Sequence, residues 1–177
     1  MKRTVSVKEA MTEKVLTTAA TATVAQAARV MAERGVGSIV IVKGKKPVGI
    51  LTERDLLMKV VAEDTKPSTI RVGKVMSSPV LTVKPDVEIT DAARTMVKNK
   101  IRRLPVVEKG KLIGIITASD ITAIAPELID VLPSRPEAAP GEEIEESVCE
   151  VCGEVTQSLY EVNGMWVCDN CRDFLGG

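Results

Sequence analysis

The chain has 177 residues, 45% of them hydrophobic, which is enough for one or two small domains with a buried core. It contains no histidine, so it lacks the commonest general base and the usual imidazole metal ligand, and we do not expect an enzyme. The equal numbers of acidic and basic residues conceal a division. Residues 1–132 carry 22 Lys and Arg against 14 Asp and Glu, whereas residues 133–177 carry 2 against 10. Either the basic part suits an anionic ligand, or both parts are ordinary solvated surfaces.

No segment has the pattern of a targeting signal or a membrane span. After Met1-Lys2-Arg3, polar and charged residues interrupt any apolar stretch of the kind found in signal peptides. No apolar run approaches the eighteen or so residues that a spanning helix needs. We therefore expect a soluble, cytoplasmic protein that does not contact a membrane.

The first two thirds of the chain contain a tandem repeat. Shifting the sequence by 65 residues makes fifteen of the 54 positions from 7 to 60 identical. The match includes the heptapeptides GILTERD at 49–55 and GIITASD at 114–120. Unrelated segments would share several times fewer residues, so the region is an internal duplication.

Each copy predicts the element order β-α-β-β-α. In the first copy a short strand over 15–18 leads into an amphipathic helix, which opens with the capping box Thr23–Gln26 and ends at Gly35. Two β-rich runs follow, at 38–42 and 48–51, joined by a turn rich in lysine and glycine. A second amphipathic helix comes after the heptapeptide. The corresponding strands of the second copy are expected at 80–83, 104–107 and 112–116.

The composition changes after Pro126. Residues 133–146 hold three prolines, five glutamates and little that could pack, which indicates a solvated, semi-rigid linker. All four cysteines follow, in the spacing C-x2-C-x15-C-x2-C, which is a strong metal-binding pattern. Two turns with paired thiolates complete a tetrahedral four-sulfur shell, and Asn163-Gly164 predicts a type I′ hairpin between them. The expected metal ligands are Cys149, Cys152, Cys168 and Cys171.

Other roles for the cysteines fit less well. Disulfides are rare in the cytosol, and a thioredoxin-like pair needs a βαβ context that is missing here. The stretch resembles a zinc ribbon of the rubredoxin-like type, including Gly153 after the first cysteine pair, although Arg172 stands where that family has a second glycine. Four thiolates accept zinc or iron, and we favour one zinc ion over iron.

The heptapeptides have a purely structural interpretation. Thr-x-x-Asp between a strand and a helix is a capping signature, with Thr at the N-cap and the acid in the first turn. This interpretation leaves the glycine, the duplication and the nearby basic residues unexplained.

The duplicated unit, closed in each copy by Gly, two aliphatics, Thr, two variable residues and Asp, resembles a pair of cystathionine β-synthase (CBS) domains, together called a Bateman module. The whole chain is similar to archaeal proteins that fuse such a pair to a zinc-ribbon-like domain. The resemblance implies an α+β fold with four parts: CBS domain 1 over 5–62, CBS domain 2 over 71–128, the linker over 133–146, and a four-cysteine zinc-ribbon/rubredoxin-like domain over 147–177.

The resemblance also implies two clefts that bind adenine nucleotides (AMP, ADP or ATP, with AMP favoured), in which the motif Thr and Asp hold phosphate and ribose. Free N–H groups at the helix starts beside Thr52 and Thr117 suit an anion. The stronger site is expected around Asp120, because arginines precede the strand of the second copy where the first has Gly-Ser. That site would use Leu16, Val36, Gly37 and Ser38 for the base, Arg54, Arg102 and Arg103 around the phosphate, and Thr117, Ser119 and Asp120 of the second heptapeptide. A weaker site would use Thr52, Asp55, Leu81 and Ile101.

These observations predict a non-enzymatic regulator. A CBS pair, self-associating as a homodimer through its helices, would sense an adenine nucleotide and pass the signal to the metal module or to an unidentified protein partner. One alternative is a nucleotide-gated iron protein that transfers electrons. A second is a transcriptional regulator that contacts nucleic acid through the ribbon, which the shortage of Lys and Arg in the tail argues against.

Overall fold

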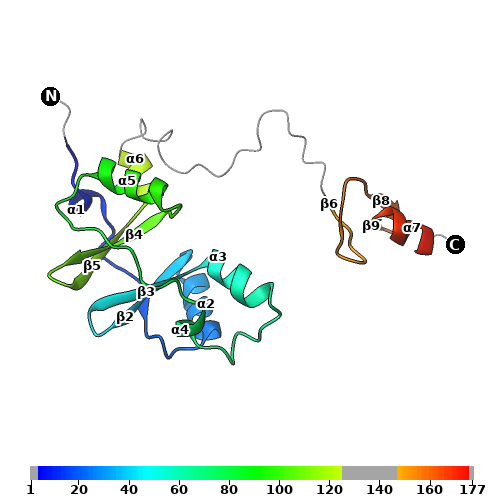
Figure 1. Cartoon of the computed structure of the whole chain (residues 1–177), viewed down its shortest axis with the longest axis horizontal. Coiled ribbons are helices and arrows are strands. Elements are labelled where there is room, and N and C mark those ends of the chain that lie inside the picture. The colour runs from blue at the N-terminus through cyan, green and yellow to red at the C-terminus, as the bar shows by residue number, and fades with distance from the viewer. Residues whose placement is uncertain (1–3, 125–146, 176–177) are drawn as a thin grey trace. The chain divides into compact units, whose positions relative to one another are not determined.

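The chain folds into two separate compact units, one built from the repeats and one from the four-cysteine segment (Figure 1). The computed structural model describes residues 4–124 and 147–175. The linker predicted over 133–146, and the end of the second CBS domain predicted at 128, lie outside the described residues. No helix of the described ranges is both long enough and apolar enough to span a bilayer.

The first repeat forms a three-stranded sheet in the order β1-β2-β3. β1 pairs parallel with β2, and β2 pairs antiparallel with β3. As predicted, Thr23 caps the long helix, with its Oγ1 accepting from the Gln26 N–H at 3.2 Å, and Gly35 (φ 62°) follows the end of that helix. The elements are β1 (Thr17–Thr18), α2 (Val24–Glu33), β2 (Ser38–Lys43), β3 (Lys46–Thr52), α3 (Glu53–Leu56) and the π-helical η1 (Leu57–Val61).

The second repeat has the same order with small differences. A single parallel bridge between Val83 and Val106 takes the place of the β1–β2 pairing. Lys100 has a φ of 53° at the position where the first repeat has Gly35, so a non-glycine residue there adopts the left-handed conformation. The elements are α5 (Ile89–Lys98), β4 (Arg103–Glu108), β5 (Lys111–Thr117) and α6 (Ala118–Ile124).

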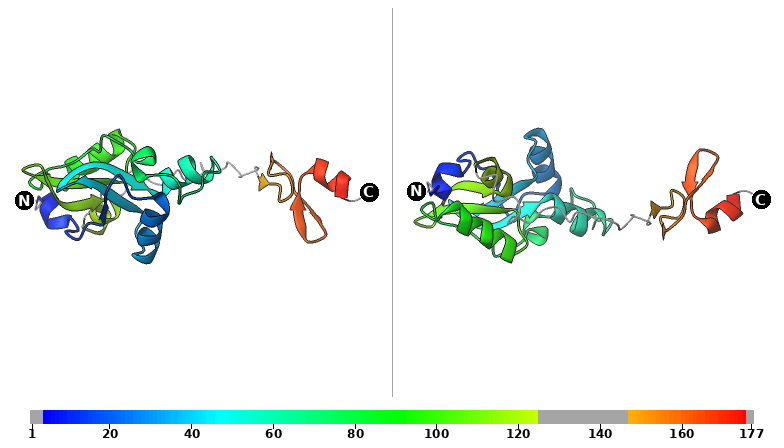
Figure 2. Two further views of the ribbon diagram at one scale, coloured as in Figure 1. Left: turned by 90° about the horizontal axis from the view of Figure 1, so that it is seen from below. Right: turned by 90° about the horizontal axis from the view of Figure 1, so that it is seen from above.

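Two short helices, which the sequence did not predict, are exchanged between the repeats. Helix α1 (Val7–Ala10) opens the first repeat but packs in the core of the second, beside α5 and α6 (Figures 1 and 2). Helix α4 (Val72–Val75) opens the second repeat but packs in the core of the first. Backbone hydrogen bonds from Val7 to Val87 and from Val72 to Ala22, at 2.8 and 2.9 Å, hold them in place. Each core therefore contains a piece of the other repeat.

The motif glycines lie where the exchanged segments cross the sheets. Thr12 pairs with Ile115 beside Gly114, and Ser77 pairs with Ile50 beside Gly49. A Cβ at Gly114 would lie 2.5 Å from the Met11 sulfur and 3.2 Å from the Thr12 carbonyl oxygen, and a Cβ at Gly49 would meet the same atoms of the equivalent residues at the same distances. The glycine of each heptapeptide is thus explained by close packing of the exchanged segment.

The four-cysteine unit consists of two small hairpins and a helix. β6 (Ser147–Val148) pairs with β7 (Val155–Thr156), and β8 (Tyr160–Val162) pairs with β9 (Met165–Val167), before α7 (Asp169–Leu175). The predicted hairpin at Asn163-Gly164 is confirmed, and φ values of 53° and 81° fit its type I′ turn.

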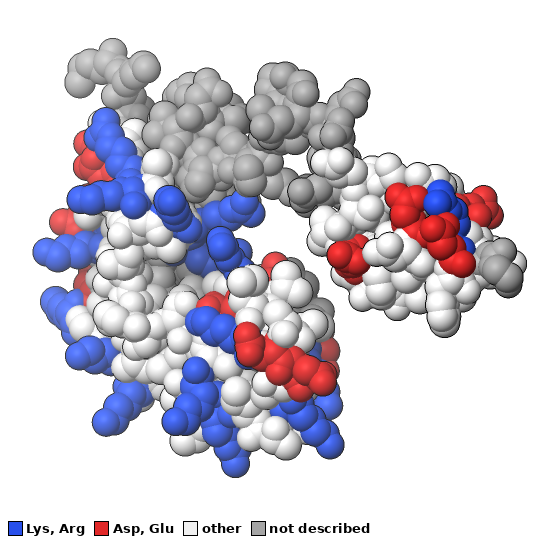
Figure 3. All heavy atoms as spheres, turned by 45° about the vertical axis from the view of Figure 1, so that its right-hand side comes forward, with Lys and Arg blue, Asp and Glu red and all other residues white. Residues whose placement is uncertain are grey.

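The two units carry opposite charge at their surfaces. On the face drawn in Figure 3, Lys and Arg predominate over the repeat unit, while acidic side chains cluster on the four-cysteine unit. This agrees with the charge division in the sequence.

Candidate functional site

Both heptapeptides form capping boxes at the junction of a strand and a helix. Oδ2 of Asp120 accepts from the backbone N–H and from the hydroxyl of Thr117, both at 2.8 Å. Oδ2 of Asp55 accepts from the same two groups of Thr52, at 3.0 and 2.7 Å. The capping interpretation therefore holds for one oxygen of each carboxylate. The two repeats differ at the other oxygen.

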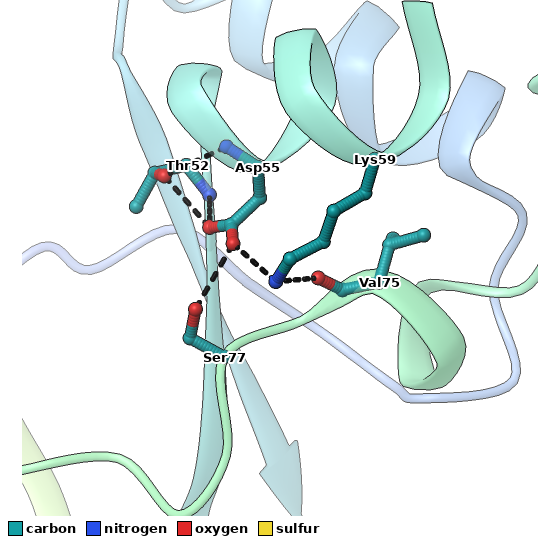
Figure 4. A network of polar contacts seen from close by, with 5 residues as sticks. All are labelled: Thr52, Asp55, Lys59, Val75 and Ser77. Atoms are coloured by element: carbon teal, nitrogen blue, oxygen red, sulfur yellow. Dashed lines mark hydrogen bonds and ion pairs between the residues drawn. The ribbon is translucent and has the colours of Figure 1, made fainter. Parts of the chain in front are cut away.

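Oδ1 of Asp55 is occupied by groups from the protein itself (Figure 4). The Lys59 ammonium donates to it at 2.7 Å and the Ser77 hydroxyl at 2.9 Å. Lys59 also donates to the carbonyl of Val75 at 2.8 Å. Burial alone would raise the pKa of Asp55, but the donors Lys59, Thr52 and Ser77 together outweigh it and hold that pKa below its usual value. Asp55 is thus a buried anion with its own counterion.

Oδ1 of Asp120 has no hydrogen-bond partner within residues 4–124 and 147–175. The side chain is half-buried. Ile124 stands at the position equivalent to Lys59, and its side chain has no hydrogen-bond donor. Thr12 stands at the position equivalent to Ser77, and its hydroxyl makes no hydrogen bond to any described residue. The Asp120 carboxylate consequently retains acceptor capacity that Asp55 has lost.

Two of the three predicted arginines, Arg102 and Arg103, lie beside the heptapeptide of the second repeat, whereas Arg54 belongs to the heptapeptide of the first. Arg103 is paired with Thr117 across the β4–β5 hairpin, and the Ala118 N–H donates to the Arg102 carbonyl at 2.8 Å. Burial lowers the pKa of Arg103, and so does the neighbouring Arg102. None of Arg54, Arg102 and Arg103 forms an ion pair with any residue that the structure describes. Their positive charge is therefore not neutralised by a direct ion pair among the described residues, and Arg103 is acted on by the Glu53 carboxylate from a longer distance.

The residues predicted to hold the base lie in the first repeat. Ser38 pairs with Thr52 across the β2–β3 hairpin, and the Gly37 carbonyl accepts from the Glu53 N–H at 3.3 Å. Over the described residues, no hydrogen bond or ion pair joins Gly37 or Ser38 to Thr117 or Asp120. The two repeats are linked here by electrostatics, because the Glu53 carboxylate of the first repeat raises the pKa of the Arg103 guanidinium in the second.

The remaining predicted residues surround these groups. Val36 precedes β2 and is exposed, whereas Ile101 precedes β4 and is partly buried. Arg54 and Ser119 are exposed in the first turns of α3 and α6. Leu16 is half-buried and its carbonyl accepts from the Val40 N–H, whereas its counterpart Leu81 is exposed.

Sequence reasoning missed three residues of this region: Lys59, Ser77 and Glu53. The repeat itself held a signal for all three. Aligning the copies sets Lys59, Ser77 and Glu53 against Ile124, Thr12 and Ala118. A Cβ on Gly37 would lie 2.6 Å from a Glu53 carboxylate oxygen, so Glu53 packs directly over the segment predicted to hold the base.

The four cysteines come together as predicted. Their sulfur atoms all lie within 4.8 Å of one another, and those of Cys152 and Cys168 are 3.7 Å apart. A tetrahedral ion with metal–sulfur bonds of about 2.3 Å requires sulfur atoms about 3.8 Å apart. The donor set and its spacing therefore fit one four-coordinate thiophilic ion.

The local structure around the cysteines differs from the two equivalent turns that the spacing predicted. Gly153 (φ 72°) donates to the Cys149 carbonyl at 2.9 Å and closes a turn after the first pair. The backbone N–H of Arg172 donates to the Cys168 carbonyl at the same distance, but this residue continues helix α7. Its guanidinium lies over the Tyr160 ring, 4.3 Å from the ring centroid. An arginine can extend a helix where a left-handed glycine would end it. The second pair therefore spans the start of a helix.

The thiols of this cluster are not equivalent. The backbone N–H of Cys152 is the main cause that lowers the pKa of Cys149 to about 6. Burial is the main cause that raises the pKa of Cys171 to about 12. Since metals bind thiolates, a bound cation would have to supply the charge that keeps Cys171 deprotonated.

Comparison with known proteins agrees with the repeat architecture. Residues 7–62 and 72–127 each match the CBS domain family. The uncharacterized protein MK0525 of Methanopyrus kandleri is 41% identical over 98% of this chain and 94% of its own length, so the similarity takes in the four-cysteine segment.

Two solved structures share the fold. A hexameric CBS-CP12 protein from bloom-forming cyanobacteria is 32% identical, with a TM-score of 0.65 over 75% of this chain and 74% of its own. The CBS domain pair of protein MJ0100, solved in complex with 5′-methylthioadenosine and S-adenosyl-L-methionine, is 25% identical, with a TM-score of 0.64 over 71% of this chain and 98% of its own. The chain belongs to the CBS domain family.

Proposed function

We propose that this protein is a non-enzymatic sensor of adenosine-containing ligands, AMP foremost, whose CBS pair binds the ligand at Asp120 and is coupled to a metal-holding four-cysteine unit. The ligand class is supported by the related pair from MJ0100, which was solved with two adenosine derivatives. The observation that carries the proposal is the Oδ1 of Asp120, which has no partner among the described residues, in a heptapeptide whose backbone adjoins Arg102 and Arg103. A carboxylate oxygen suits a ribose diol, and guanidinium groups suit a phosphate.

The test is calorimetric titration of AMP into the parent chain and into Asp120→Ala. The substitution removes the charge-assisted hydrogen bonding to the ribose, a net loss of about 1.5–3 kcal/mol, so affinity should fall roughly ten- to a hundredfold. Asp55→Ala should have a much smaller effect, because Asp55 is already occupied by Lys59 and Ser77.

A matched control is Asp86→Ala, which changes the charge equally at an exposed position. Unchanged AMP binding in this control would exclude a general electrostatic effect. Equal losses in the Asp120 and Asp55 variants would contradict the assignment of a preferred site. Failure of AMP to bind the parent chain would reduce both heptapeptides to helix caps.

In this proposal the ion has a structural role. The buried apolar core of the unit is small, consisting of Val167 with Cys149 and Cys168, flanked by a few partly buried side chains. Such a core cannot stabilise a fold of this size without a covalent or metal link. We propose zinc as the ion, held by all four cysteines.

A second candidate function is electron transfer, favoured by the same four-sulfur donor set, since iron in such a site carries out one-electron chemistry. The metal content and absorption spectrum of the purified protein distinguish the two. A colourless protein with one zinc per chain supports the structural role, and a red protein with thiolate-to-iron charge-transfer bands supports the electron carrier.

Self-association is part of the proposal. Leu57, Met58 and Val61 lie on η1 and expose 58, 56 and 67% of their surface, which is unusual for large apolar residues on adjacent turns. We propose that this face forms a homodimer. Light scattering should give the dimer mass for the parent chain and the monomer mass for Met58→Glu, while a parent chain that is monomeric at all concentrations would exclude the dimer.

A further inference from the structure

The two motif carboxylates differ in how many of their acceptor positions are filled. The two oxygens of an ionised carboxylate offer about four lone-pair positions. Asp55 accepts four hydrogen bonds: two from Thr52, one from Lys59 and one from Ser77. Asp120 accepts two, both from Thr117, among the residues that the structure describes. Asp120 thus retains the two positions that the hydroxyls of a diol need, and Asp55 retains none.

The donors that fill Asp55 are held from both sides. Lys59 lies on η1 and also donates to the carbonyl of Val75, the last residue of α4 (Figure 4). Ser77 follows α4 on the exchanged segment, where its backbone exchanges two hydrogen bonds with Ile50 at 2.8 and 3.0 Å. Asp55 is only 7% exposed. A ligand would have to displace an ammonium and a hydroxyl that the fold itself fixes in place.

The second repeat has the same backbone but lacks these donors. Thr12 exchanges hydrogen bonds with Ile115 at 2.9 Å in both directions, as Ser77 does with Ile50, so the exchanged segments are equivalent. The residue equivalent to Lys59 is Ile124, which is 45% exposed and carries no donor on its side chain. The two sites therefore differ by two donors: the Lys59 ammonium, which has no counterpart in Ile124, and the Ser77 hydroxyl, whose counterpart on Thr12 makes no hydrogen bond to a described residue.

We propose that Lys59, assisted by Ser77, acts as an internal substitute for a ligand at Asp55 and so restricts the CBS pair to one bound nucleotide, at Asp120. This inference rests on the proposed function and adds its stoichiometry and the residue that determines it. Lys59 is a specificity-determining residue that acts by occupying Asp55 rather than by contacting the nucleotide.

Exchanging the two residues between the repeats tests the proposal. AMP is titrated into the full-length metal-loaded chain, with 5′-methylthioadenosine as a second probe that shares the ribose diol. The parent chain should bind one AMP. Lys59→Ile combined with Ser77→Ala frees both acceptor positions on Oδ1 of Asp55 and should bind two, with the second lost again when Asp55→Asn is added. Lys59→Arg keeps a cation and should still bind one.

The reciprocal variant, Ile124→Lys, places an ammonium four residues after Asp120 at an exposed position that tolerates it. It should weaken AMP binding at least tenfold, although an added positive charge would by itself favour an anion. Thr122→Lys adds the same charge on the same helix, but at a spacing of two residues that does not face Asp120, so it should not weaken binding. The reciprocal variant remains informative if Lys59→Ile/Ser77→Ala does not fold.

The outcomes separate this inference from the function on which it rests. One AMP bound by both the parent and a folded Lys59→Ile/Ser77→Ala variant, or unchanged affinity in Ile124→Lys, overturns the role of Lys59 and leaves the sensor intact. If the parent binds two AMP and Asp55→Asn loses one of them, the role of Lys59 is likewise overturned and the sensor remains. No binding of either probe to the parent chain overturns the proposed function and this inference together.

Discussion

Replacing the motif glycines with alanine should destabilise the repeat unit by forcing the exchanged segment away from the sheet. In Gly49→Ala the new Cβ would lie 2.5 Å from the sulfur of Met76, 3.1 Å from its Cγ and 3.2 Å from the Ser77 carbonyl oxygen. Unstrained carbon contacts are about 3.5–4.0 Å. The methionine tip can turn aside. The carbonyl cannot move freely, because the backbone of Ser77 is hydrogen-bonded to Ile50.

The expected magnitude follows from two opposed effects. Overpacking of this kind costs about 1–3 kcal/mol. Alanine also lowers the conformational entropy of the unfolded chain, which stabilises the folded state by about 0.4–1 kcal/mol where the backbone conformation suits alanine. It does so here, because the φ of Gly49 is not positive. The midpoints of the two ranges give a net loss of about 1.3 kcal/mol. Gly114→Ala should lose a similar amount, because Met11 and Thr12 stand at the same distances there.

Thermal unfolding of four proteins measures this effect: the parent, Gly49→Ala, Met76→Ala and the double variant. Removing the methionine side chain removes the closest contact, so the double variant should be more stable than the sum of the single losses predicts. Gly35→Ala is the control. Its Cβ meets no atom within 4 Å, but its φ of 62° imposes about 1–2 kcal/mol of strain that Met76→Ala should not relieve. Additive losses at Gly49 and Met76, or a fully stable Gly49→Ala, would refute the steric explanation.

Three further predictions concern other parts of the chain. Cys168→Ser should release the ion and unfold the four-cysteine unit, while the CBS pair keeps its own melting transition. Trp166 is the only tryptophan of the sequence, so its fluorescence reports on the four-cysteine unit alone. A variant that stays folded without metal would contradict the four-sulfur site. The pKa of Asp55 is lowered in the folded state, so its contribution to stability is present above about pH 4 and is lost as the pH falls towards the folded pKa. The free energies of unfolding of the parent and of Asp55→Asn, measured from pH 6 to pH 2, should therefore converge as the pH falls. A constant difference between them would contradict this. Thr23→Ala removes the capping box of α2 and should lower the free energy of unfolding by about 1 kcal/mol, whereas Thr69→Ala, at an exposed position outside any helix, should lower it less.

Local patterns in the sequence predicted most of the elements correctly. The capping box at Thr23, the type I′ turn at Asn163-Gly164 and the spacing of the four cysteines depend on interactions between near neighbours, so the sequence carries their signals directly. The period of apolar residues placed the long helices and strands within a few residues.

Features that depend on distant residues were not predictable in this way. Helices α1 and α4 have four residues each, too few to show a period, and their burial depends on cores supplied by the other repeat. The pairing of Lys59 with Asp55 looks in the sequence like any exposed i, i+4 ion pair. Only the Ser77 hydroxyl and the Val75 carbonyl, which arrive from the exchanged segment, make it part of a buried network.

The exchange of α1 and α4 also bears on how such a chain can arise. The boundaries of the duplicated segment differ from the boundaries of the set of residues that folds together, because each core contains the short helix of the other copy. A single ancestral copy with this topology would have no core in which to bury its own Val7–Ala10 segment, except that of a second molecule. Reciprocal pairing of two identical chains is therefore the natural precursor, and gene fusion would have made a transient encounter permanent. The two copies were then free to diverge in sequence while remaining dependent on each other for folding.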